Sequence, residues 1–148
     1  MGELDPTWKT IATNIATKLA SLTGVRSATA DVPEAPPSMT PAVVVFPPEF
    51  VLDEAGATDV YEANFPVVSV LDAGNSWAVF TAQAYALIDQ LVPAFHTGRR
   101  LSLPLIVINS HVRDMVPDVE ITEWGEPVVP GLRFTIQVAV RVAAVRTD

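Results

Sequence analysis

The stretch 132-LRFTIQVAVRV-142 decides the fold. Every even position in it is apolar, whereas the odd positions carry two arginines, a threonine, a glutamine and an alanine. An alternation with a period of two, rich in β-branched side chains, is typical of a strand with one face on a hydrophobic core. Such a strand is not stable alone. The sequence therefore predicts a sheet whose other strands lie earlier in the chain and whose apolar face is covered by helices.

Two stretches have apolar residues at the three- and four-residue spacing of one-faced helices. The first runs over residues 8–22 and ends at Gly24, and the second runs over residues 77–95. Trp8 and Trp77 lie on the apolar sides of these two patterns. We therefore expect both indole rings to belong to the core rather than to a ligand site.

The remaining strands are indicated by short apolar runs. Residues 42–46 form one run, residues 60–71 return from an acidic hairpin tip over 49–62, and residues 119–124 precede the final strand and pair with it. Between the second helix and residue 119 the pattern is compatible with a loop or a strand. We predict a single α+β domain over residues 1–148, in the order α-β-β-α-β-β. Its mainly antiparallel or mixed sheet has a long hairpin and is covered on one face by two amphipathic helices.

Charge is unevenly distributed along the chain. Residues 1–75 hold ten acids and three bases (net −7) and residues 76–148 hold seven acids and six bases (net −1), which together give −8. An acidic chain without a basic stripe repels phosphate backbones, so specific nucleic-acid binding is not expected. Cysteine is absent, and no run of about 20 apolar residues or basic leader is present, so we expect neither disulfides nor a membrane span nor a signal peptide.

Two groups of residues are candidates for contacts with partners. The segment 49–62 has five acids and no base, and is either a solvated hairpin tip or a functional negative patch. Those acids are Glu49, Asp53, Glu54, Asp59 and Glu62. The second group is proposed for contacts between subunits or with a partner and comprises Arg99, Arg100, Trp124, Arg133 and Arg141. Arg99 and Arg100 have an alternative role, because bases after a helix compensate its exposed carbonyl groups.

Residues capable of catalysis are few. No phosphate loop, dinucleotide fingerprint, GxSxG elbow or HExxH helix is present, so we predict no catalytic, cofactor or metal site and no enzymatic activity. His111, Asp114, Asp118 and Glu120 could supply a mixed histidine and carboxylate metal site in a small hydrolase, but polar residues at strand ends are the favoured explanation of them. His96 falls in the last turn of the second helix, where a cation is favoured by the helix dipole.

Several stretches together resemble the tail terminator, or tail completion, proteins of long-tailed bacteriophages. The resemblance rests on element order and local texture and extends over nearly the whole chain. It is strongest in LTGVRSATADVPEAPPSMTPAVVVFP (22–47), NSWAVFTAQAYALIDQLVPAF (75–95) and GLRFTIQVAVRV (131–142).

The resemblance implies a structural protein of the virion, assembled in the host cytoplasm. Its subunits would form a hexameric ring at the head-proximal end of the tail tube, stop tube polymerisation, and join the tube protein to the head connector. DNA would pass through the ring without specific binding, and an acidic inner wall would keep that polyanion moving. A head-tail connector or stopper subunit is the nearest alternative, and the small metal-dependent hydrolase is a more remote one.

Overall fold

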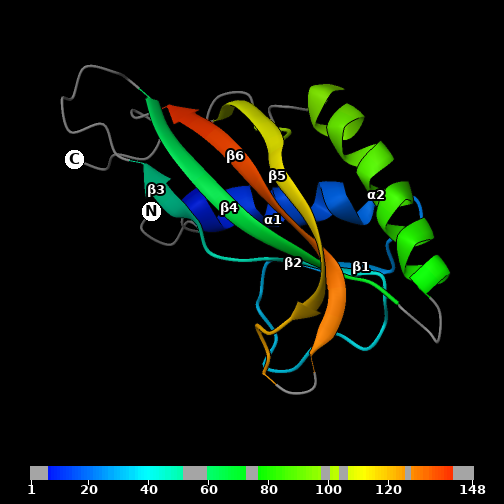
Figure 1. The fold of residues 1–148 in the computed structure, drawn as a ribbon. Helices are drawn as coiled ribbons and strands as arrows, with labels where there is room; N and C mark the ends of the chain where they lie inside the picture. The colour runs from blue at the N-terminus through cyan, green and yellow to red at the C-terminus, as the bar shows by residue number, and fades with distance from the viewer. Residues whose placement is uncertain are drawn as a thin grey trace.

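A computed structural model describes residues 7–51, 60–72, 77–97, 101–103, 107–125 and 128–141. The fold is α+β, with a mixed six-stranded sheet and two helices (Figure 1). The helices are α1 (Thr7–Ala20) and α2 (Trp77–Thr97). The strands are β1 (Ser27–Thr29), β2 (Ala42–Val45), β3 (Glu49–Val51), β4 (Val60–Val70), β5 (Val107–Ile121) and β6 (Val129–Arg141).

The sheet is built around the long antiparallel pair β4 and β6. Its order is β1-β2-β4-β6-β5, and β3 pairs with the part of β4 that β2 does not reach. Among the described strands β1 and β2 pair in parallel, and the other strand pairs are antiparallel. Both long strands are therefore flanked on each side, while β5, β1 and β3 lie at the margins.

One face of the sheet carries the main core. The alternation in the last strand is confirmed, because Leu132, Phe134, Ile136, Val138 and Val140 are all buried. Side chains from both helices join the same cluster, so α1 and α2 cover the same face of the sheet. Their buried members recur at helical spacing and are Ile11, Ile15 and Leu19 of α1 and Phe80, Ala84, Leu87, Leu91 and Phe95 of α2.

The opposite face is covered over only part of its length. At one end Val68, Val70 and Ile121 form a second, smaller cluster that Phe46 and Trp124 cover in part. Further along, most residues of β4 and β6 on this face are polar or small, and they are half-buried or, at Glu62, exposed. The two faces thus differ as the alternation of apolar and polar residues requires.

The order of elements differs from the predicted α-β-β-α-β-β by two short strands, β1 and β3. Three residues are too few for a periodic signal, and both strands exist because a longer neighbour offers free backbone groups. Strand β5 also begins well before residue 119, at Val107.

Residues 52–59 lie outside the described residues, so the hairpin tip stays a prediction. None of the helices in the described ranges is long and apolar enough to cross a membrane.

Candidate interaction surface

The free edge of β5 is the first part of the candidate surface. Within the described residues this 15-residue strand pairs on one side only, with β6. Its register shifts between Val107 and Asn109, between Arg113 and Val116, and again before Ile121. The second shift is a bulge that contains Asp114, whose φ of 57° lies in the left-handed region. Bulges discourage strand addition, which leaves 109–113 as an uninterrupted five-residue edge.

The outer face of α2 is the second part of this surface. Trp77 is 66% exposed, Tyr85 64% and Val92 54%, and the only charged side chain in the described turns of the helix is Asp89. A solvent-facing helix surface that is largely uncharged and carries two large aromatic rings is typical of a protein contact.

The expected burial of Trp77 is wrong, although the expected burial of Trp8 is partly confirmed. Trp77 is the first residue of α2 and makes an edge contact with Phe80, at a centroid distance of 6.0 Å, at the margin of the core. The spacing of apolar residues along the helix does not show that the first turn of α2 extends past the part of the helix that is packed on the core. Trp8 is half-buried and packs against the main core.

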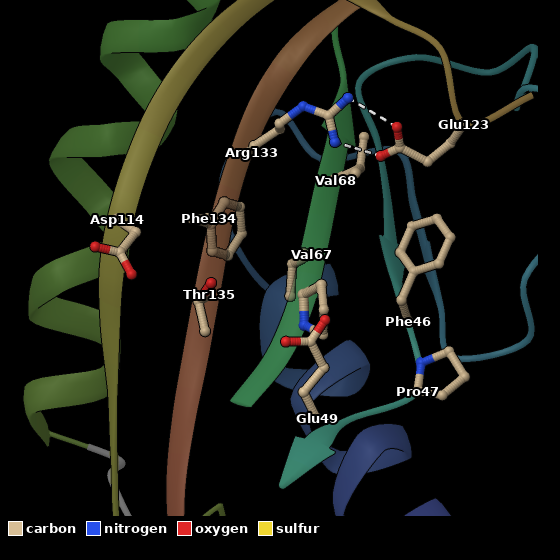
Figure 2. A pocket seen from close by; sticks show the side chains of 11 residues that line it. Phe46, Pro47, Glu49, Val67, Val68, Asp114, Glu123, Arg133, Phe134 and Thr135 are labelled. Carbon is tan, nitrogen blue, oxygen red and sulfur yellow. Dashed lines mark hydrogen bonds and ion pairs between the residues drawn. The ribbon is translucent and has the colours of Figure 1, made fainter. Parts of the chain in front are cut away.

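A shallow hollow of about 430 Å³ lies on the partly open face of the sheet. Figure 2 shows the Phe46 ring on one side of it and Asp114 of β5 on the other, with Thr135 of β6 between them. Glu49 and Glu123 also line it. Its walls are apolar and its rim is acidic, so it would favour a small apolar or basic group over an anion.

Arg133 closes one end of this hollow as the centre of an ion cluster. Its Nη2 donates to Glu123 Oε1 at 2.7 Å, and its Nη1 donates to the second oxygen of Glu123 (Figure 2). Its Nε donates to Asp118 Oδ2 at 2.7 Å. The hydrogen bond from Arg133, together with one from the backbone N–H of Glu120, lowers the pKa of Asp118. The same carboxylates raise the pKa of Arg133, chiefly through Glu123.

The predicted contact residues are placed as follows. Arg133 and Trp124 already have partners within the chain, since the Trp124 Nε1 donates to the Pro33 carbonyl at 2.9 Å and its ring lies near Phe46. Contacts of these two residues with another subunit stay a prediction. Arg141 pairs with Val60 through the backbone, and its side chain is not described. Arg99 and Arg100 lie outside the described residues.

The acidic group is described only at its two ends. Glu49 on β3 and Glu62 on β4 are both exposed. Glu49 pairs with Asn64, two residues from Glu62, so the two carboxylates project from the same face of the sheet. Asp53, Glu54 and Asp59 lie outside the described residues, and their place on a negative patch stays a prediction.

The four residues of the possible metal site are not brought together. His111 pairs with Gln137 and Asp118 pairs with Gly131, six positions away on β6, which separates them by roughly 20 Å. Asp118 is bound to Arg133, and Glu120 contributes a backbone N–H to it rather than a carboxylate. The described residues contain no group of three or more histidine and acidic side chains that could hold a metal ion.

Comparison with models of known protein families found no match, and neither did comparison with curated protein sequences. The case for a function therefore rests on the residues themselves. Sequence reasoning missed the outer face of α2, although its scarcity of charge is visible in the printed sequence. It also missed the interruptions of β5, of which Asp114, Pro117 and Asp118 are the visible sign.

Proposed function

We propose that this protein is a tail terminator of a long-tailed bacteriophage, which forms a ring on the head-proximal end of the tail tube. The observation that carries the proposal is the exposed, nearly uncharged outer face of α2 beside the free edge of β5. A chain with a net charge of −8 repels its own copies at long range, so contacts between copies should use its least charged surface. The surface therefore supports an assembly role rather than a solitary one.

The acidic hairpin supports the same proposal through electrostatics. Glu49 and Glu62 project from one face of the sheet, and three further acids lie in the sequence between them. Repeated around a ring, such a patch would line a channel with negative charge and keep DNA from binding to its wall. A partner-facing position for the patch is the alternative, since the tube or the connector could carry complementary bases.

The experiment is electron microscopy of particles from the parental virus with this gene interrupted. Headless tubes of excessive and uneven length are the expected result, because tube growth would lack its stop. Normal-length tails beside heads that leak DNA would contradict the terminator function and indicate a head-tail connector instead.

A complementation series tests the acidic patch separately. Reversal of Asp53, Glu54 and Asp59 to lysine should leave the melting temperature of the purified protein nearly unchanged while it reduces the yield of infectious particles. Reversal of the exposed acid Glu34, which lies in the loop before β2, is the control and should complement normally. Unfolding of the hairpin variant would contradict a functional role and indicate a structural one.

A further inference from the structure

The outer edges of β3 and β5 lie at the same level on opposite sides of the sheet. Along one row of paired residues, Glu49 of β3 is followed by Asn64 of β4, Gln137 of β6 and His111 of β5. The three residues of β3 thus share their rows with 109–111, the first part of the uninterrupted segment 109–113. Within the described residues each of these edges pairs on one side only.

We propose that copies of the chain join head to tail, with residues 111–113 of one copy paired to β3 of the next, two residues further along β5 than the shared rows. This inference rests on the proposed ring and specifies how its subunits connect. Four antiparallel strands lie at this level, so β3 and β5 run in opposite directions. Copies placed side by side in the same orientation therefore form an antiparallel pair, which is a heterologous contact that can close into a ring.

An exposed apolar side chain at one edge also matches an apolar hollow at the other edge of the proposed contact. Phe50 is 45% exposed and lies in the row of Ala63, on the face covered by the helices. At the opposite edge a hollow of about 250 Å³ lies between α2 and β5, and Val92, Phe95 and Val112 are among its lining residues. Val112 also lies on the helix-covered face, because it pairs with buried Ile136. Antiparallel pairing of Phe50 with Val112 would place the phenyl ring at this hollow.

Charge complementarity between the two edges favours the same pairing. The register that pairs Phe50 with Val112 sets Glu49 opposite Arg113, so an acid of one copy meets a base of the next. Arg113 is 45% exposed and its bond to the neighbouring Asp114 is a surface ion pair, so little opposes an exchange of partners. A two-fold pairing of β5 with itself would instead bring His111 and Arg113 of both copies onto one seam, which is less favourable.

The experiment is cysteine cross-linking, for which the chain is suited because it contains no cysteine. The double variant Glu49→Cys/Arg113→Cys places two thiols at opposed positions and keeps the net charge at −8. Oxidation at about 1 M salt, where the Debye length is about 3 Å, reduces repulsion between copies. We expect a ladder of covalent multimers that ends in one closed species on a non-reducing gel.

Three variants serve as controls. Each single variant should stay monomeric, and Glu49→Cys/Val112→Cys should stay monomeric too, because the two thiols would lie on opposite faces of the joined sheet. Dimers from Arg113→Cys alone would overturn the proposal in favour of two-fold pairing. A double variant that yields no multimers, or only dimers, would also overturn it.

A charge exchange gives a second measurement with the cysteine-free chain. Sedimentation should show that Arg113→Glu weakens association by about fivefold, as expected for an exposed pair, and that addition of Glu49→Arg restores it. Failure of the double variant to restore association would overturn the proposed register. The function is judged independently: overlong tubes without a cross-linked ladder would contradict only this inference, whereas a ladder with normal tails would contradict only the terminator function.

Discussion

Replacement of Gly131 by alanine is expected to destabilise the protein through a clash near the start of β6, where it pairs with the end of β4. A β-carbon at this position would lie 2.3 Å from the backbone oxygen of Ser69 and 2.6 Å from Cδ1 of Ile121. The φ of Gly131 does not lie in the left-handed region, so conformational strain is not the cause. Without the clash, alanine would stabilise a strand by about 0.5–1 kcal/mol relative to glycine. A loss of stability therefore indicates that the clash is present, and a gain indicates that it is not.

The size of the loss in stability depends on which neighbouring atoms must shift to make room for the added carbon. Overpacking costs about 1–3 kcal/mol of stability. Because a paired backbone carbonyl shifts less easily than the end of a side chain, we expect a clash cost at the upper end of this range, about 3 kcal/mol. Subtraction of the alanine preference leaves about 2 kcal/mol. For a domain of this size that corresponds to a fall in melting temperature of about 4–8 °C.

Thermal unfolding followed by far-ultraviolet circular dichroism measures the effect. Gly24→Ala is a useful comparison, since its φ is 91° and nothing lies within 4 Å of the added carbon, so it should show only the cost of the left-handed backbone. Addition of Ile121→Val to Gly131→Ala removes the Cδ1 of Ile121 but leaves the Ser69 carbonyl in place. The double variant should therefore not regain stability. A Gly131→Ala protein that melts at or above the wild-type temperature would refute the reasoning.

Three further outcomes are expected. Asp118→Asn should lower the free energy of unfolding by about 0.5–1 kcal/mol at neutral pH; because the folded-state pKa lies below 3.8, urea titrations should show this difference above about pH 4 and its loss as the pH falls further. Val138→Pro should abolish the folded circular dichroism spectrum, since β6 is paired on both sides there, whereas Val138→Ala should keep it. Leu91→Ala should cost about 2–5 kcal/mol in chemical denaturation, and Tyr85→Ala, on the exposed side of α2, less than about 0.5 kcal/mol.

The central elements of the fold could be predicted because their signals are local and repeated. In β6 the alternation continues over many residues, and both helices carry buried side chains at regular spacing. Strands β1 and β3 could not be predicted in this way, because each consists of three residues that pair where β2 or β4 offers free backbone groups. Their existence depends on the sheet, and no pattern within three residues encodes it.

The candidate surface was less accessible to prediction because it depends on register. Phe50 and Val112 are distant in sequence, and only the order of pairing across β4 and β6 shows that they lie on the same face at opposite edges, two rows apart. Arg133 illustrates the opposite case. Its alternating position predicts a side chain outside the core, but its partners Asp118 and Glu123 follow from how β5 and its following turn lie beside β6.

The contact between Trp8 and Phe50 gives the chain an optical reporter of its own assembly. The two rings meet edge to face at a centroid distance of 4.8 Å, so a change in the surroundings of the phenyl ring would also change those of the indole. Trp77 and Trp124 lie elsewhere and could be replaced by phenylalanine to leave one emitting residue. Tryptophan emission from such a variant should then shift with protein concentration if copies join at β3, without any attached dye.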